Sequence, residues 1–357
     1  MSTEIIEPTG EPISASISTP STNEYLQGLK DKTILLTGAA GYLGTALTSS
    51  LHGIRCRIVA LVHQKNCGPL PDESEASLRS LPVDLSQSVW LDVLRQTRPD
   101  VIVNLAAHEH HRNSQHAPAR DLAVNTATVL ELLEACRELR LNPRIVLASS
   151  ANIAGCPSSM VVNEDTPDQP LTLFAINKLA AEQYLRYYAA TFNIAAVSLR
   201  FANVYGPLPT RHLEIESRVV LNHIMRRALA GGPLYLYRNQ NCVRDFVYID
   251  DVTRAICAAA TSETIIAGDK YIVGSGEGYS LREIVNEIAT RAEHLNGRHV
   301  AVLSDEGAAL EPIEWRNFIA DYGRLRSATG WALRIKLHQG IDSTLQAFSG
   351  GKSHWKS

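Results

Sequence analysis

The stretch that decides the fold is Thr33-Ile34-Leu35-Leu36-Thr37-Gly38-Ala39-Ala40-Gly41-Tyr42-Leu43-Gly44. Its first residues form an apolar run without polar alternation, which is typical of a strand buried on both faces of a parallel sheet. The three glycines then permit a tight turn, close approach of the backbone to a pyrophosphate, and close packing of a helix on the strand. Residues 45–51 have a helical pattern, and the N-terminus of that helix would offer free N–H groups to phosphates. The sequence therefore predicts a dinucleotide-binding loop over residues 37–44.

Further apolar runs of the same kind lie along the chain after this loop. They are Arg57–Val62, Val101–Leu105, Arg144–Ala148 and Ala195–Arg200. Amphipathic helical patterns separate them, including residues 125–140 and 176–191. Such alternation of strands and helices predicts an α/β fold with a doubly wound parallel sheet of the Rossmann type.

The pattern changes after residue 205, where prolines and glycines interrupt the chain and helical patterns recur only within loop-rich sequence. We therefore expect a dinucleotide-binding domain over residues 31–205, with strands added by later segments. A smaller C-terminal substrate-binding lobe is expected over residues 206–348. Residues 1–30 and 349–357 contain few large apolar groups, so we expect a flexible arm and a flexible tail.

Composition excludes several classes of partner. The 357 residues include 34 Lys plus Arg and 37 Asp plus Glu, so the net charge of -3 gives no electrostatic case for nucleic acid or an anionic membrane. No run approaches the roughly 18 apolar residues of a membrane-spanning helix. The six cysteines are scattered, with no Cys-x-x-Cys pair, and the first residues lack an apolar signal core. We expect a cytoplasmic protein with reduced thiols.

The end of the second strand bears on the choice of cofactor. An acid there would bind the adenosine ribose 2′-hydroxyl of NAD, whereas a base would accommodate the 2′-phosphate of NADP. His63 lies at this place, Lys65 follows, and no acid appears before Asp72. The two bases favour NADP, and a solvated loop is the alternative. Asp84 is expected to contact adenine or to cap a helix, so NAD and NADP both stay open.

Six separate stretches share a pattern with a known group of enzymes. They are Thr37–Gly44, Asn104–Ala107, Ser149-Ser150, Leu199–Pro207, Val243–Val252, and Gly274–Glu277 followed by Ser280–Glu283. Together they resemble the extended short-chain dehydrogenase/reductase superfamily, in particular its nucleotide-sugar epimerase and dehydratase branch. The resemblance covers roughly residues 32–347. It implies NAD or NADP as cofactor, a nucleotide-linked sugar as substrate, and a homodimer formed through the helices at 125–140 and 176–191.

The resemblance also implies roles for individual residues. Those expected to bind the cofactor are Gly38, Gly41, Tyr42, Leu43, Gly44, His63, Asp84, Leu85, Leu105, Ala106, Ala107, Asn125 and Lys178. Those expected to contact substrate are His110, Ser114, Asn203 and Arg244. The alternatives are a solvated loop for His110 and Ser114, and an ion pair with Asp245 or a neighbouring acid for Arg244. The His-rich segment 108–112 also has the composition of a zinc site, but the matching loop of the family needs no metal, so we expect none.

The catalytic residues of the superfamily are a Ser or Thr, a Tyr, and a Lys four residues after the Tyr. Ser150 and Lys178 match, and by resemblance they would hold the reacting oxygen and the nicotinamide ribose. Phe174 stands at the position of the Tyr. A phenyl ring has no exchangeable proton, so it cannot act as the general acid or base.

Three interpretations of Phe174 stay open. Another group could move the proton, with Ser150, a water, His110, His111 and Tyr205 as candidates. The substrate could supply its own acid–base group in an unusual reaction. Alternatively, the chain could bind a dinucleotide or nucleotide sugar without catalysing a reaction. Loss of a general acid or base slows a reaction by about 100- to 10,000-fold without abolishing it, so we expect an active enzyme.

Two further departures bear on the reaction. Dehydratases of the family carry an Asp-Glu pair after the catalytic Ser or Thr, whereas Ala151 and Asn152 follow Ser150 here. This disfavours a 4,6-dehydratase. Glu311 stands where related epimerases have a phosphate-binding Arg, and Arg316 lies five residues later. We expect hydride transfer at a hydroxyl or keto carbon of a nucleotide-linked sugar, of the epimerase type, with a ketoreductase as the alternative.

Overall fold

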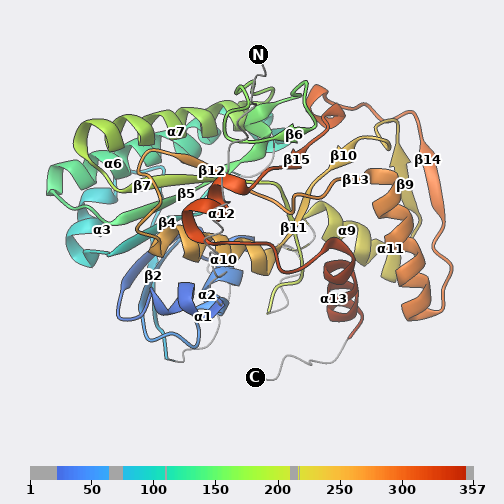
Figure 1. Cartoon of the computed structure of the whole chain (residues 1–357), viewed down its shortest axis with the longest axis horizontal. Helices are drawn as coiled ribbons and strands as arrows, with labels where there is room; N and C mark the ends of the chain where they lie inside the picture. Colours follow the sequence, from blue (N-terminus) through green and yellow to red (C-terminus); the bar gives the residue numbers. More distant parts are fainter. Residues whose placement is uncertain (1–21, 64–74, 109–110, 210–215, 217, 351–357) are drawn as a thin grey trace, which may run out of the picture.

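A parallel sheet forms the core of the main domain, at the left in Figure 1. The structure, a computed structural model, describes residues 22–63, 75–108, 111–209, 216 and 218–350. Within this part of the chain the sheet has seven strands in the order β12-β7-β5-β4-β1-β2-β3. The strands are β1 (Thr33–Thr37), β2 (Arg57–Val62), β3 (Ser77–Pro82), β4 (Val101–Asn104), β5 (Arg144–Ser150), β7 (Ala196–Phe201) and β12 (Lys270–Val273). The predicted doubly wound parallel sheet is confirmed.

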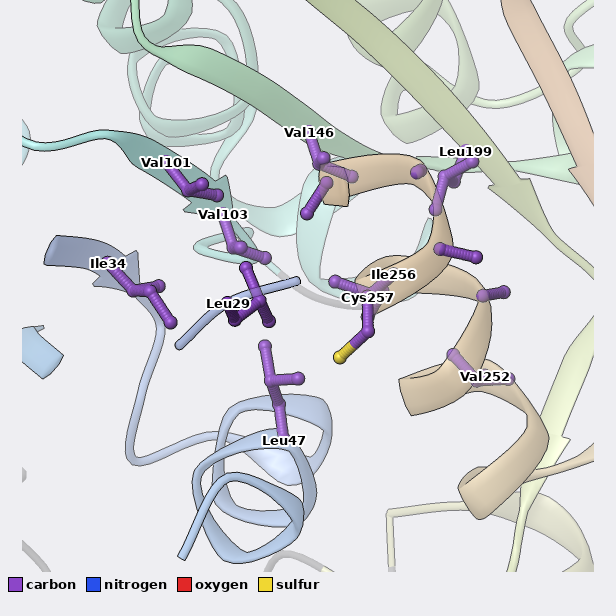
Figure 2. Packing of buried hydrophobic residues seen from close by; sticks show 14 of the residues in the cluster. Leu29, Ile34, Leu47, Val101, Val103, Val146, Leu199, Val252, Ile256 and Cys257 are labelled. Carbon is purple, nitrogen blue, oxygen red and sulfur yellow. The ribbon is translucent and has the colours of Figure 1, made fainter. Parts of the chain in front are cut away.

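Side chains of the strands alternate between two hydrophobic layers. Ile34 and Leu36 of β1 face the layer that contains α10 (Ile249–Thr261) and α2 (Tyr42–Ser50). Figure 2 shows this layer, with Ile256 and Cys257 of α10 beside Val103 and Leu29. Leu35 of β1 faces the opposite layer, which holds α3, α6 and α7. These helices span Trp90–Thr97, Thr128–Leu139 and Leu173–Phe192.

The strand order reverses between β1 and β4. From β1 the chain adds β2 and β3 on one side, and from β4 it adds β5 and β7 on the other. In open parallel sheets, ligands bind outside the carboxyl ends of the strands at such a switch point. The glycine loop follows β1 and the segment from Leu105 follows β4, so both lie at this place.

A second group of elements packs beside the carboxyl ends of the strands (Figure 1). Its helices are α9 (Val220–Leu229), α11 (Leu281–Asn296) and α13 (Leu337–Ser349), and its paired strands are β9 (Leu234–Tyr237) and β14 (Val302–Asp305). Short strand pairs join it to the main domain: β8 (Asn203–Tyr205) with β11 (Phe246–Tyr248), β10 (Val243–Arg244) with β13 (Tyr279–Ser280), and β6 (Val161–Val162) with β15 (Ile319–Ala320). Tyr42 of α2 belongs to the same hydrophobic cluster.

Some boundaries differ from those expected. Residues 22–30 are not a flexible arm, because α1 (Thr22–Gln27) forms there and Tyr25 and Leu29 are buried in the core. The remainder of that arm, residues 1–21, lies outside the described residues, as do residues 351–357 of the tail. No helix in the described ranges has the length and apolar character needed to cross a membrane.

Candidate active site

In the glycine loop, backbone segments pack closely against one another because side chains are absent at Gly38 and Gly44. Gly38 has φ +64°, and a Cβ there would lie 2.8 Å from the backbone nitrogen of Ala106. A Cβ on Gly44 would lie 2.2 Å from the carbonyl oxygen of Gly38. Side chains at these positions would collide with backbone atoms, so the glycines permit the tight turn and the close helix–strand packing of a pyrophosphate-binding loop at the N-terminus of α2. The loop therefore fits the dinucleotide that the sequence predicts.

The strand ends on both sides of the switch point are tied together by buried hydrogen bonds. Thr37 Oγ1 donates to Asn104 Oδ1 at 2.5 Å and accepts from the backbone nitrogen of Ala106 at 3.0 Å. The glycine loop thus lies against the segment Leu105–Ala107, which is the arrangement that the cofactor prediction requires. The side chain of Tyr42 points elsewhere, since its hydroxyl donates to the carbonyl of Gly206 at 2.6 Å.

The adenosine end of the predicted site contains a basic and an acidic side chain, His63 and Asp84. His63 Nε2 lies 4.0 Å from Asp84 Oδ2, and both side chains are solvent-accessible. Hydrogen bonds from Ser86 to Asp84 lower the pKa of that carboxyl, so it is ionised at neutral pH. Leu85 packs beneath, against the layer of α3 and α6. The negative charge of Asp84 therefore lies close to His63. The other base predicted near the cofactor, Lys65, lies outside the described residues.

The predicted catalytic residues come from β5 and the first turns of α7. Thr172 caps α7 by accepting from the backbone nitrogen of Ala175 at 3.2 Å. Lys178 Nζ donates to the carbonyl of Ala148 at 3.0 Å and lies 5.7 Å from the centroid of the Phe174 ring. Ser150 is half-buried at the end of β5, where its Oγ accepts from the nitrogen of Asn152 at 3.2 Å. Phe174 and Lys178 thus stand side by side, with Lys178 anchored next to the end of β5.

An ionic network beneath this site fixes the ends of β5 and β7. Ser149 Oγ donates to Glu182 Oε1 at 2.5 Å, and Glu182 also accepts from the buried guanidinium of Arg200. Arg200 extends to Asp168, which Lys270 of β12 also contacts at 3.1 Å. Because Ser149 is committed to this network, Ser150 is the serine that remains at the site surface.

A second buried cluster surrounds Asp121, which is completely inaccessible to solvent. Ser114 Oγ and Asn125 Nδ2 donate to its Oδ1 at 2.5 and 2.9 Å, and Asn177 Nδ2 donates to its Oδ2 at 2.6 Å. His108 Nδ1 lies 3.5 Å from Oδ1. Ser114, predicted as a substrate contact, is fully buried and holds Asp121 instead. Asn125, predicted to bind the cofactor, also donates to the carbonyl of His108 at 3.4 Å.

The arrangement of the Asp121 cluster depends on an irregular turn in the helix that contains Asn125. Residues 118–122 form α5, and residues 123–127 continue as one π-helical turn before α6. Such wide turns are frequent at functional sites. This turn carries Asn125 and Thr126, and Thr126 Oγ1 donates to the carbonyl of Asn177 at 2.9 Å. The turn therefore bonds directly to α7, one residue before Lys178.

Two arginines meet at the substrate side of the site. Arg244 is buried and donates to the backbone carbonyls of Val243, Glu314 and Arg316. Burial, together with the positive charge of Arg244, lowers the pKa of Arg316 to about 10. Neither arginine forms an ion pair with a described residue, and Arg316 Nε is buried without a hydrogen-bond partner. Two adjacent guanidinium groups, with Glu314 nearby but no ion pair in the described chain, would suit phosphate oxygens.

The alternative of an ion pair between Arg244 and Asp245 is wrong. Asp245 accepts instead from the backbone of Ser275, Gly276 and Ala320, and from Ser275 Oγ. Burial raises the pKa of Asp245 to about 6, an effect that these donors oppose. Asn203 joins this structural group, because its Nδ2 donates to the carbonyl of Asp245 at 2.8 Å.

One other candidate for the missing proton carrier, Tyr205, can be placed in the described part of the chain. Tyr205 is completely buried and donates to the carbonyl of Leu337 at 3.1 Å, so it cannot reach a substrate. His110 lies outside the described residues, as does the side chain of His111. Within the described ranges, no group of three or more His, Cys, Asp or Glu side chains is arranged to hold a metal ion.

Residues 34–274 match the sequence model of the NAD dependent epimerase/dehydratase family. The chain belongs to this family. The match covers the glycine loop, the ends of β4 and β5, the start of α7 and Arg244, which are the parts that the geometry brings together. The family is one of NAD-dependent enzymes, so the fit of the glycine cradle to a dinucleotide and the family assignment agree.

Individual relatives of this epimerase/dehydratase are distant but cover nearly the whole chain. It is 27% identical over 325 residues to UDP-glucose 4-epimerase of Mycolicibacterium smegmatis, across 88% of this chain and 97% of that protein. It is 25% identical over 347 residues to dTDP-glucose 4,6-dehydratase of Neisseria gonorrhoeae, across 90% and 97%. The structure is similar to UDP-glucose 4-epimerase of Thermus thermophilus in complex with NAD, with a TM-score of 0.71, 28% identity, and 90% and 100% of the two chains covered.

The sequence missed the residues whose importance depends on their neighbours. His108 and Asp121 lie in the loop and helix after β4, and no motif marks them as a pair. Asn177 precedes Lys178, but only the structure shows its bond to Asp121. Arg316 stood out in the sequence as a displaced arginine, and the structure places it beside Arg244.

Proposed function

We propose that this enzyme is an NAD-dependent epimerase that inverts a hydroxyl-bearing carbon, C4 of the hexose, in a nucleoside diphosphate sugar. The observation that carries the proposal is the pairing of a glycine cradle at the switch point with the buried Arg244 and half-buried Arg316 on the substrate side. The glycine cradle fits a dinucleotide, and the two arginines fit the diphosphate of a nucleotide sugar. The relatives named as UDP-glucose 4-epimerases support C4 as the reacting carbon.

The chemistry divides between cofactor and protein. When bound, the nicotinamide supplies hydride uptake from a carbon–hydrogen bond and hydride return. The protein must hold the sugar, bind the reacting oxygen and move its proton. We assign Ser150 Oγ to the reacting oxygen because it is the accessible serine at the end of β5. Lys178 is assigned to the nicotinamide ribose.

A dehydratase is disfavoured by the chain itself. Elimination of water requires an acid and a base beside the sugar. The turn after Ser150 carries Ala151, Asn152, Ile153 and Ala154, none of which can serve. The similarity to a dTDP-glucose 4,6-dehydratase therefore reflects the shared fold and cofactor site.

We propose NAD as the cofactor on the basis of Asp84. Its ionised carboxylate lies 4.0 Å from His63 at the predicted adenosine end. A ribose 2′-phosphate would meet this negative charge, whereas a 2′-hydroxyl could donate to it. Binding of NAD and NADP to the apoprotein, followed by calorimetry, tests this assignment, and tighter binding of NADP would contradict it.

We further propose a homodimer formed through α7 and α6 in the cytoplasm. Ile176, Tyr184 and Tyr187 are exposed on one face of α7, an arrangement that suits a helical interface. Two leucines of the same helices, Leu133 and Leu185, cannot contribute to such an interface because they are buried in the core of the chain itself. All five cysteines within the described ranges are free thiols, which fits a reducing compartment. Sedimentation of wild-type protein and of Tyr187→Glu tests the interface.

The reaction is tested by following an isotope. Purified protein is incubated with UDP-glucose, UDP-galactose or UDP-glucuronate deuterated at C4 and without added cofactor. An epimerase returns the removed hydride to the same carbon, so the C4 epimer forms with its deuterium retained. Proton NMR and mass spectrometry of the product report both facts.

Other results would each identify a different activity. Turnover of a keto sugar only with added NADH or NADPH would indicate a ketoreductase and overturn the epimerase. Tight binding of a dinucleotide and a nucleotide sugar, with conversion of no substrate, would indicate a binding protein that does not catalyse.

A further inference from the structure

We infer that His108, oriented by Asp121, carries the proton that Phe174 cannot. The inference rests on the proposed hydride-transfer function and names the acid–base group of that site. It is built from the position of His108 at the sheet edge and from its contact with the buried Asp121 carboxylate.

His108 lies on the catalytic edge of the sheet. β4 ends at Asn104, which pairs in register with Leu147 of β5. The next residue of β5, Ala148, accepts from Lys178 Nζ. The segment from Leu105 to His108 therefore runs beside the end of β5, where Ser150 and Lys178 are held. A side chain four residues beyond β4 belongs to the same edge as both of them.

Asp121 is arranged to orient an imidazole. It is completely buried, and Ser114, Asn125 and Asn177 each donate a hydrogen bond to it. Three donors suit an ionised carboxylate, which only accepts. The fourth group that faces it is His108 Nδ1, at 3.5 Å. This nitrogen is buried and makes no hydrogen bond within the described chain, so the Asp121 carboxylate is the polar group that lies beside it.

The contact fixes the tautomer of the ring. A carboxylate that only accepts requires the proton of His108 to reside on Nδ1, which leaves the lone pair on Nε2, the opposite side of the ring. The His108 side chain keeps 20% of its surface exposed, so a ligand can reach it. At 3.5 Å the contact is longer than a normal hydrogen bond. Catalytic hydrogen bonds are often long in the free enzyme and shorten once substrate is bound.

The proton step balances without Phe174. The substrate O–H bond breaks and its proton bonds to His108 Nε2, while the carbon–oxygen double bond forms and the hydride from the same carbon passes to oxidised nicotinamide. In the reverse direction Nε2 returns the proton to the oxygen as the hydride is returned. The Asp121 carboxylate faces the ring and stabilises the imidazolium between the two steps. Asp121 is thus a positioning residue, and Asn177 links it to α7 next to Lys178.

The test compares two histidines of the same region. His108→Gln is expected to lower kcat by about 100- to 10,000-fold, the contribution of a general acid or base, with dinucleotide affinity unchanged. His116→Gln, at the exposed end of α4 (His111–His116), is the matched control and is expected to keep full activity. Equal kcat in His108→Gln and wild type, with wild type active, would overturn the inference while leaving the proposed function intact.

A second readout does not depend on activity. Nitrogen-15 NMR of the free protein is expected to show the His108 ring with its proton on Nδ1, and Asp121→Asn is expected to abolish this preference. A proton on Nε2 in the wild type would overturn the inference, even if Asp121→Asn fails to fold. If wild type converts no nucleotide sugar, the proposed function fails, and the ring tautomer alone decides whether the His108–Asp121 pair exists.

Discussion

Lys178 Nζ lies 5.7 Å from the centroid of the Phe174 ring, within the range in which a cation is attracted to an aromatic face. The ring thus accompanies the lysine that by resemblance holds the nicotinamide ribose, at the position where relatives of the superfamily have a hydroxyl. This attraction requires only the face of the ring and no hydroxyl. It also shows where a hydroxyl could be restored.

Restoring that hydroxyl should compensate for the loss of His108. In the His108→Gln background, Phe174→Tyr is expected to raise kcat by at least about 10-fold, since a general acid or base contributes about 100-fold or more. Phe192→Tyr, exposed at the other end of α7, is the matched control and should give no recovery. Steady-state kinetics of the double variants decide the matter. Equal recovery in both, or none in either, would argue against a proton relay at this place.

The glycine loop should tolerate no side chain at residue 44. A Cβ on Gly44 would lie 2.2 Å from Gly38 O and 2.6 Å from Ala39 Cα, and backbone atoms cannot move aside. Gly44→Ala should lower stability by about 1–3 kcal/mol and remove dinucleotide binding. Gly53→Ala meets no atom within 4 Å and should leave both unchanged. Thermal unfolding and dinucleotide titration measure the two effects, and full binding by Gly44→Ala would refute the assigned cradle.

The paired arginines should govern affinity for the nucleotide sugar. Arg244→Lys keeps a charge but loses the forked geometry that suits phosphate. A charged hydrogen bond contributes about 1.5–3 kcal/mol, so the Kd of a UDP-sugar should rise by about 10- to 100-fold, with NAD affinity unchanged. Arg238→Lys, exposed in the same lobe, is the control. Calorimetric titration with both ligands checks the prediction. An unchanged Kd for the UDP-sugar in Arg244→Lys would place the diphosphate elsewhere.

Asp245 should make stability depend on pH in acid. Burial raises its pKa from 3.8 to about 6, so between these values the folded protein keeps a proton that the unfolded chain releases. Its contribution is therefore complete below about pH 4 and is lost as the pH rises through 6. Relative to Asp245→Asn, the wild type should lose roughly 3 kcal/mol between pH 4 and 7. Urea unfolding across this range tests the sign, and a constant difference between the two proteins would contradict it.

The fold could be predicted from the sequence because strands buried on both faces are continuous apolar runs. Thr33–Thr37 and Arg57–Val62 have the same bounds in the structure. The strand Ser77–Pro82 was not predicted because it lies at the sheet edge, and Leu78 and Leu81 are its only large aliphatic residues. Lys270–Val273 is only four residues long and joins the sheet from the C-terminal half. Neither position is marked by local pattern, since tertiary pairing decides both.

The candidate site could be predicted where a contiguous motif carries the chemistry. Gly38, Ser150 and Lys178 were identified in this way, and they lie along the same edge of the sheet. The pairing of His108 with Asp121 could not be predicted, because it depends on the π-helical turn and on the hydrogen bond from Asn177. Ser114 shows the converse. A motif predicted that it contacts substrate, but in the structure its buried hydroxyl donates a hydrogen bond to Asp121.

The most direct test of the account is to identify what the purified protein carries. The untreated protein is denatured, the chain is removed, and the released small molecules are measured by absorbance and mass spectrometry. The account predicts NAD in a near-stoichiometric amount, because an epimerase regenerates its cofactor in every cycle and need not release it. Release of no dinucleotide, together with failure of added NAD(H) and NADP(H) to bind, would contradict the account at its foundation.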